Sequence, residues 1–179
     1  MPPAPTASSP TASSPTASSQ TATSQTATSQ TATSVIVLCG GTSRRMGGAD
    51  KTRALLGATT VLDRLLDTLP SCWDVVCVGE ERPTTRAVTW CREEPPRGGP
   101  VAGIAAGLLT VDASVCVVVG GDMPFAAAAL PTLLEALNAQ RGLDAVLGLD
   151  PKGRRQPLLA AYRVEALRSA LPGEPGGAR

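Results

Sequence analysis

The stretch VIVLCGGTSRRMGGADKT, residues 35–52, begins as an apolar run and continues into a loop rich in glycine and basic side chains. The apolar, β-branched residues Val35 to Cys39 are typical of a buried strand. The run stops at Gly40 and Gly41, and an amphipathic helical pattern follows the loop. Glycine has no Cβ, so unpaired backbone N–H groups in such a turn can approach an anion closely. The stretch therefore predicts a strand, a turn and a helix, with an anion site at the turn.

The same loop carries three cationic side chains, Arg44, Arg45 and Lys51. A solvated turn that is basic by chance is the plain alternative, and the density of glycine and positive charge weighs against it. The loop matches neither common phosphate fingerprint. Asp50 stands where G-x-x-x-x-G-K-[ST] requires glycine, and G-x-G-x-x-G does not occur, so a dinucleotide site has no support.

The composition excludes several classes of function. The chain has 179 residues, 42% of them hydrophobic and 17% charged, with a net charge of +1. That balance suits one folded domain and offers no general attraction to nucleic acid or an anionic membrane. Aromatic residues make up 2% of the chain, so no stacking platform for single strands is expected. The absence of histidine excludes Ser-His-Asp and Cys-His catalysis and histidine-ligated zinc.

The five cysteines are odd in number and form no C-x-x-C pair. Cys39, Cys77 and Cys116 lie within predicted strands, so we interpret them as reduced thiols in the core of a cytoplasmic protein. The longest uncharged stretch beyond residue 34 runs from Gly98 to Val111 and is too short to span a membrane.

Residues 1–34 contain no charged side chain and consist of near-repeats of PTASS and then QTATS. Such a segment cannot bury a core, so we expect a disordered extension and a folded domain over residues 35–179. It has neither the basic nor the apolar region of a secretory signal.

Within the folded part, strand and helix patterns alternate. This alternation predicts a three-layer α/β/α sandwich around a mostly parallel, Rossmann-like sheet, which binds ligands at the carboxyl ends of its strands. The predicted strands cover residues 35–39, 74–79, 86–90, 114–119, 145–149 and 157–162, and the predicted helices cover 61–69, 100–110, 130–137 and 164–171.

Two features are expected at the edge of the sheet where the carboxyl ends of the strands lie. Asp122 follows the predicted central strand, and its carboxylate suits Mg²⁺, although a helix cap or a solvated loop residue is the alternative. Gly98 to Gly103 open a helix whose free N–H groups could face an anionic ligand. Alternatively, the small residues Gly99, Gly103 and Gly107 only let that helix pack closely on the sheet.

Residues 38–51 match the signature L-x-G-G-x-S-x-R-M-G-x-D-K, with one extra residue between Gly47 and Asp50. The chain thus resembles the molybdenum cofactor guanylyltransferases (MobA-type) of the nucleotidyltransferase superfamily. The resemblance implies a nucleotide-diphospho-sugar-transferase-like fold, catalysis by Lys51, Asp122 and Arg45, and Mg²⁺ held by Asp122. It implies nucleotide contacts at Leu38, Cys39, Gly40, Gly41, Ser43, Lys51, Gly79, Glu94, Gly99 and Asp122.

The resemblance also implies an acceptor side and several departures. Gln156-Pro157-Leu158 resembles a family strand beside the acceptor, and Arg155 next to it would meet a phosphate, unless Arg154 and Arg155 form a solvated turn. Glu94 stands where the family usually has Asp, and Gly79 where it has Asn. We find no counterpart of the family's C-terminal N/D-x-x-T-P-E-D-L segment beyond about residue 171, so either a fragment or an open site is expected.

The implied activity is transfer of GMP from Mg–GTP to the molybdenum–molybdopterin cofactor, with release of pyrophosphate. Acceptor molybdoenzymes and other cofactor-biosynthesis proteins are the implied protein partners. Two alternatives stay open. One is a cytidylyl or other nucleotidyl transfer to a different phosphorylated acceptor, against which Asp50 argues because related cytidylyltransferases usually carry Pro there. The other is a non-catalytic nucleotide-binding protein.

Overall fold

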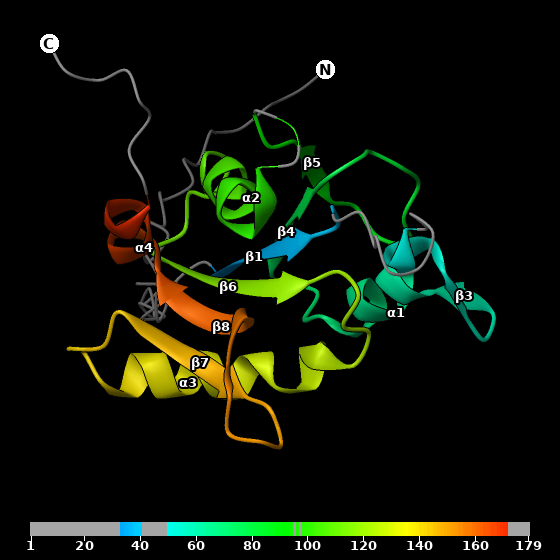
Figure 1. Cartoon of the computed structure of the whole chain (residues 1–179). Helices are drawn as coiled ribbons and strands as arrows, with labels where there is room; N and C mark the ends of the chain where they lie inside the picture. Colours follow the sequence, from blue (N-terminus) through cyan, green and yellow to red (C-terminus); the bar gives the residue numbers. More distant parts are fainter. Residues whose placement is uncertain (1–32, 41–49, 95, 97, 172–179) are drawn as a thin grey trace, which may run out of the picture. The chain divides into compact units, whose positions relative to one another are not determined.

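A six-stranded sheet lies at the centre of the folded unit, with strand order β5-β4-β1-β6-β8-β7 (Figure 1). The computed structural model describes residues 33–40, 50–94, 96 and 98–171. β5, β4, β1 and β6 are parallel, whereas β8 is antiparallel to both β6 and β7. The strands are β1 (Thr33–Leu38), β4 (Asp74–Val78), β5 (Thr89–Cys91), β6 (Val115–Gly120), β7 (Ala145–Leu149) and β8 (Arg155–Arg163).

Helices cover both faces of this sheet. The helices are α1 (Val61–Thr68), α2 (Gly99–Leu108), α3 (Leu130–Ala139) and α4 (Val164–Ala170). α1 and α3 pack with Val35 and Val37 of β1 on one face, and α2 packs with Ile36 on the other. Because β1 is buried on both faces, its apolar run is continuous rather than alternating. The predicted three-layer sandwich with a mostly parallel sheet is confirmed.

The first strand begins two residues before its predicted start. Thr33 and Ser34 pair with Val115 and Cys116 of β6, so the parallel ladder takes in two polar residues that the sequence assigned to the N-terminal extension. These two residues belong to the strand because of their backbone hydrogen bonds, which a hydrophobicity pattern does not reveal. Residues 1–32 lie outside the described residues, and their disorder stays a prediction.

The third predicted strand, residues 86–90, is largely wrong, because β5 starts only at Thr89. The side chain of Arg86 donates to carbonyl oxygens at and beyond the end of α1, among them Leu66 at 3.5 Å and Trp73 at 3.1 Å. Its segment therefore caps the α1–β4 connection instead of joining the sheet. The sequence patterns also missed a small hairpin of β2 (Leu55–Leu56) and β3 (Thr59–Thr60), and the 3₁₀ turns η2 (Lys51–Arg53) and η3 (Ala126–Ala128).

The cysteines are free, and the three assigned to strands are buried. Cys77 and Cys116 lie in β4 and β6, while Cys39 follows β1 directly. The neighbouring Cys39 thiol and burial raise the pKa of Cys77, and burial raises the pKa of Cys116 to about 12. These thiols are core residues and not nucleophiles. None of the helices in the described part of the chain has the length and apolar character to cross a bilayer.

Candidate active site at the carboxyl edge of the sheet

The ends of β1, β4 and β6 meet at one edge of the sheet, where the chain leaves all three strands. Hydrogen bonds continue the ladder beyond the strands, from Cys39 N to Val78 O at 2.8 Å and from Gly121 N to Leu38 O at 2.9 Å. β1 lies between β4 and β6, so the connections diverge to either side of it. This is the topological switch point of a doubly wound sheet, where such folds bind ligands.

Lys51 stands on a short turn that packs against the end of β6. Asp50 caps η2, and its Oδ1 accepts hydrogen bonds from Thr52 N at 2.9 Å and Thr52 Oγ1 at 2.6 Å. Thr52 is buried, and its Cγ2 would be 3.2 Å from a Cβ placed on Gly121. Lys51 directly precedes Thr52, and Asp122 directly follows Gly121, so this contact brings a cationic and an anionic residue to the same edge. Lys51 is exposed.

Asp122 is exposed at the end of β6, and no other residue of the described part of the chain forms a hydrogen bond or ion pair with its carboxylate. Its Oδ1 would be 3.0 Å from a Cβ placed on Gly120, so the carboxylate folds back over the strand end. The described residues hold no group of three or more His, Cys, Asp or Glu side chains arranged to bind a metal ion. Mg²⁺ in phosphate-transfer sites needs only one or two carboxylates, because waters and substrate phosphates complete its shell. A single accessible Asp122 fits that requirement.

The glycines of α2 divide between the two readings that the sequence left open. A Cβ on Gly107 would be 2.7 Å from Ile36 Cγ2, and a Cβ on Gly103 would be 3.2 Å from Leu38 Cδ2. These two glycines let α2 pack on β1. Gly99 has open space around its Cβ position, but its φ of 84° itself favours glycine, and it begins α2 beyond Leu38 at the same edge.

Two acidic residues, Glu93 and the predicted Glu94, lie next to each other after β5. The Glu93 Oε2 atom lies 3.4 Å from the Cβ position of Gly103, between α2 and the ends of β1 and β4, whereas Glu94 is exposed. Spacing does not show which of two adjacent side chains turns inward, so Glu94 stays a prediction.

Gly79 contributes a close approach of the backbone and not a side-chain contact. Its φ is 152°, and a Cβ there would be 3.2 Å from both Cys39 C and Cys39 Cβ. A larger residue in this position would push the end of β4 away from Cys39 and Gly40.

The predicted acceptor side begins at the same edge, because β8 runs antiparallel to β6 and Arg155 is its first residue. Gln156 pairs with Gly148 of β7, and Arg155 and Pro157 are exposed. Arg154 is different. Its Nε donates to Asp150 Oδ2 at 2.7 Å within the β7–β8 turn. The turn alternative is therefore right for Arg154, and Arg155 stays a candidate.

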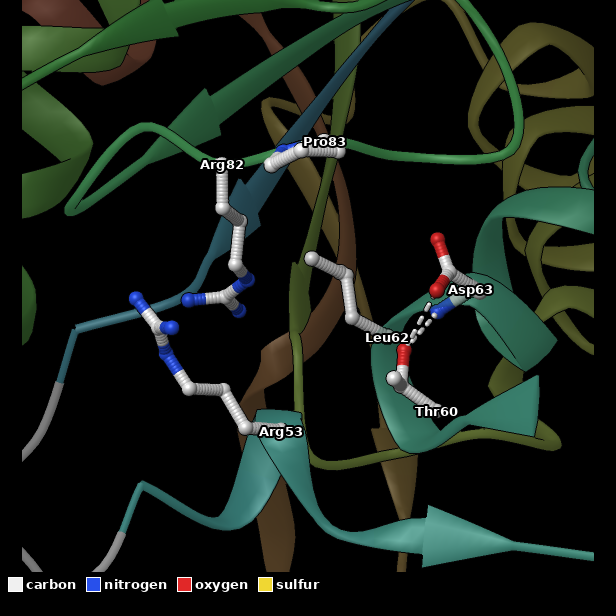
Figure 2. A pocket seen from close by; sticks show the side chains of 6 residues that line it. All are labelled: Arg53, Thr60, Leu62, Asp63, Arg82 and Pro83. Atoms are coloured by element: carbon white, nitrogen blue, oxygen red, sulfur yellow. Dashed lines mark hydrogen bonds between the residues drawn. The ribbon is translucent and has the colours of Figure 1, made fainter.

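One group of hydrogen bonds at this edge was not predicted from the sequence. Arg82, from the β4–β5 connection, donates to Asp50 Oδ2 at 3.0 Å and to Thr52 Oγ1. Partial burial raises the pKa of Asp50, but the Thr52 hydrogen bonds and the charges of Arg82 and Arg53 outweigh it and hold that pKa below its usual value. Figure 2 shows the Arg53 and Arg82 guanidinium groups converging beside a pocket of about 240 Å³ that Thr60, Leu62, Asp63 and Pro83 also line. No local pattern signals a pair 32 residues apart.

Three predicted site residues, Gly41, Ser43 and Arg45, lie outside the described residues. Nucleotide binding by Gly41 and Ser43 and a catalytic role of Arg45 stay predictions.

The chain is similar to known proteins in both sequence and structure. A family model described as MobA-like NTP transferase domain matches residues 35–179. A "probable molybdenum cofactor guanylyltransferase" of Methanosarcina acetivorans is 33% identical over 148 residues, covering 75% of this chain and 65% of the relative. The chain thus spans slightly less than two thirds of that relative's length.

Among solved structures, molybdopterin-guanine dinucleotide biosynthesis protein A from Archaeoglobus fulgidus matches with a TM-score of 0.57 and 29% identity, over 77% of this chain and 72% of that one. The 2-C-methyl-D-erythritol 4-phosphate cytidylyltransferase of Thermus thermophilus matches with a TM-score of 0.54 and 19% identity, over 77% and 73%. The second match bears on the fold alone.

Proposed function

This chain belongs to the MobA-like NTP transferase domain family, and from that premise we propose that it is a nucleotidyltransferase that transfers GMP from Mg–GTP to a molybdopterin-type acceptor phosphate. One observation carries the proposal. Thr52 contacts Gly121, and this contact holds the exposed Lys51, which precedes Thr52, and the exposed Asp122, which follows Gly121, at the switch point of the sheet. A cation for phosphate oxygens and a carboxylate for a hard metal are the two elements that phosphoryl chemistry needs most.

In the proposed reaction, an oxygen of the acceptor's terminal phosphate attacks the α-phosphorus of GTP. The bond from that phosphorus to the oxygen shared with the β-phosphate breaks, so GMP joins the acceptor and pyrophosphate leaves. The attacking oxygen is already negatively charged, so no general base is required, and a chain without histidine can support the chemistry. Positioning and charge neutralisation would supply most of the rate.

Each residue has a distinct role in this proposal. Lys51 contacts the triphosphate and neutralises charge that develops on the leaving group. Asp122 would hold Mg²⁺, which when bound neutralises phosphate oxygens and orients the substrate. The ends of β1 and α2, at Gly40 and Gly99, would bring backbone N–H groups to the nucleotide. Arg155 and Gln156 would face the acceptor, and Gly41, Ser43 and Arg45 are further predicted contacts of the triphosphate.

The test is pyrophosphate release with Mg–GTP and molybdenum–molybdopterin, measured for the native chain, Asp122→Ala and Asp112→Ala. Asp112 is an exposed aspartate that precedes β6, at the opposite end of the strand, and it provides a matched control. We expect Asp122→Ala to lose about 10²- to 10³-fold in rate, as for other electrostatic elements of catalytic sites, and Asp112→Ala to keep the native rate. Equal rates in all three proteins would refute the role of Asp122.

Preference for GTP or for CTP distinguishes the proposed guanylyl transfer from cytidylyl transfer. The fold likeness to a cytidylyltransferase keeps CTP as the second candidate. Titration with GTP and CTP in parallel should give the tighter dissociation constant for GTP. Preference for CTP would redirect the assignment to a different acceptor, and GTP binding without pyrophosphate release would favour a non-catalytic nucleotide-binding protein. We place the reaction in the cytoplasm, since five free thiols suit a reducing compartment.

A further inference from the structure

Arg82 closes a ring of hydrogen bonds around the turn that carries Lys51. Its Nη1 donates to Asp50 Oδ2 at 3.0 Å, and its Nη2 donates to Thr52 Oγ1. Thr52 Oγ1 in turn donates to Asp50 Oδ1 at 2.6 Å. Each of the three side chains therefore contacts the other two. The pairing is charge-assisted, which makes it stronger than hydrogen bonds between neutral groups.

The guanidinium of Arg82 is itself held in place. The Arg82 side chain is only 10% exposed, and its guanidinium carbon lies 5.5 Å from the ring centroid of Trp90 in β5. A planar cation over an aromatic face is attracted to it and loses little further freedom when it forms hydrogen bonds. Arg82 thus connects the turn after β1 to a strand on the far side of β4.

The ring holds Thr52 from one side while the sheet holds it from the other. The Thr52 hydroxyl belongs to the ring, and its methyl group packs against Gly121. Lys51 precedes Thr52, and its carbonyl oxygen accepts from Ala54 N at 3.1 Å. The backbone of Lys51 is therefore set by the position of Asp50 and Thr52 relative to the end of β6.

We propose that Arg82 is a positioning residue, which holds Asp50 and Thr52 so that Lys51 stands at a set place relative to Asp122. This inference rests on the nucleotidyl transfer proposed above, because Lys51 is there the cation that meets the triphosphate. Arg82 itself touches neither nucleotide nor acceptor in this proposal. Small displacements of a positioned group cost up to about 100-fold in rate, so a residue with this role matters without contacting substrate.

Arg53 provides a matched control. Its Nε lies 3.3 Å from the same Asp50 oxygen, but its side chain is 50% exposed and also pairs with the exposed Glu80 at 3.4 Å. No described hydrogen bond joins Arg53 to Thr52. Exposed ion pairs contribute little, so Arg53→Met should remove one nearby cation and leave the turn in place.

The kinetic test is a double-mutant cycle on pyrophosphate release from Mg–GTP. Arg82→Met should lower kcat/KM by roughly 10- to 100-fold, and Lys51→Met should cost much less in the Arg82→Met background than in the native one, because a displaced lysine has little left to lose. Arg53→Met should stay within about twofold of native and add independently to Lys51→Met. Arg82→Lys, which can reach Asp50 but cannot also reach Thr52, should fall between native and Arg82→Met. Additive effects of Arg82→Met and Lys51→Met would overturn the positioning role.

A second readout needs no substrate. Trypsin cleavage after Lys51, followed by mass spectrometry on the full chain, should be about tenfold faster in Arg82→Met than in Arg53→Met, because losing charge-assisted hydrogen bonds opens the turn more often. If Arg82→Met does not fold, Arg82→Lys is compared in its place, and faster cleavage than in Arg53→Met is again expected. Unchanged cleavage would overturn the role of Arg82 by itself. If the native chain neither binds GTP nor releases pyrophosphate, the proposed function has failed, and the cleavage result still decides whether Arg82 holds the turn.

Discussion

Two turns of this chain are each built around an aspartate, Asp50 or Asp150, that accepts from a backbone N–H two residues on and from arginine, and only the Asp50 turn has an arginine from another connection. Asp50 accepts from Thr52 N at 2.9 Å and from Arg82, and Asp150 accepts from Lys152 N at 2.8 Å and from Arg154. Both carboxyl groups have a pKa below the usual value. At Asp150 the hydrogen bond from the Arg154 backbone is the main cause, and at Asp50 the Thr52 bonds and two arginine charges overcome the effect of burial.

The difference lies in what each arginine connects. Arg154 is four residues from Asp150 and 72% exposed, so its ion pair closes a hairpin turn and nothing else. Arg82 is 10% exposed and joins a separate connection to the Asp50 turn, which in turn packs against Gly121. An aspartate turn becomes part of a site when its partners come from other elements.

Substitution of the lysine in each turn should give the largest difference in rate between the two turns. Lys51→Met should reduce pyrophosphate release from Mg–GTP by about 10²- to 10³-fold, because one preorganised charge at the phosphates is lost. Lys152→Met, which removes the same charge from the Asp150 turn, should leave the rate at the native value. Steady-state assays of both variants measure this difference, and a large effect of Lys152→Met would mean that net charge, not position, is responsible.

The glycines of the two regions should respond to substitution in opposite order. A Cβ on Gly121 would be 3.1 Å from Leu38 O and 3.2 Å from Thr52 Cγ2, so Gly121→Ala should destabilise by about 1–3 kcal/mol through overcrowding, and Gly121→Asn by more. Gly153 has a φ of 74° and no atom within 4 Å of its Cβ position. Gly153→Ala should cost only about 1 kcal/mol, and Gly153→Asn less, since asparagine tolerates the left-handed region. Urea unfolding of the four variants tests the two orders, and the same order at both positions would contradict the distinction.

The smallest expected effect is a pH dependence of the Asp50 turn. Because the folded pKa of Asp50 is depressed, its stabilisation is fully present above the unfolded value near 3.8 and is lost as the pH falls through the folded pKa. Asp50→Asn should therefore destabilise by about 1 kcal/mol at pH 7 and by less at pH 3, which lies below the unfolded value. Urea unfolding at the two pH values measures this change.

At pH 7, 0.5 M NaCl should weaken the effect of Asp150→Asn on the free energy of unfolding more than that of Asp50→Asn, because the exposed Arg154 pair is screened more strongly. Equal salt sensitivity would show that the Arg82 pair behaves as a surface ion pair.

Most of the sheet was predictable because its central strands are continuous runs of apolar residues. Val115 to Val119 and Val75 to Val78 are apolar without interruption, as strands buried on both faces must be. The edge strand β5 was placed too early, since Arg86 and its neighbours are decided by hydrogen bonds to α1 and not by their own propensity. Short elements such as β2 and β3 left no periodic pattern to detect.

For the candidate site, the carboxyl-end rule and the glycine-rich motif sufficed to select Lys51 and Asp122, which do lie at one edge. They did not show how two adjacent residues of the same chemistry differ in orientation. Glu93 turns toward α2 while Glu94 is exposed, and Arg154 is bound to Asp150 while Arg155 is not. In each case two adjacent residues have the same chemistry, and the direction of the backbone at that point separates them.

The fold class, the edge of the sheet where chemistry is expected, and the residue types that meet there can all be inferred from the amino-acid sequence. Hydrophobic periodicity, glycine turns and a long motif are local properties, and each is readable within a few residues. Only the tertiary structure decided that Thr52 packs on Gly121, that Gly107 seats α2 on Ile36, and that Arg82 reaches Asp50. These contacts join residues that are far apart in the chain, and their geometry exists only after the strands have been ordered and the helices packed on the sheet.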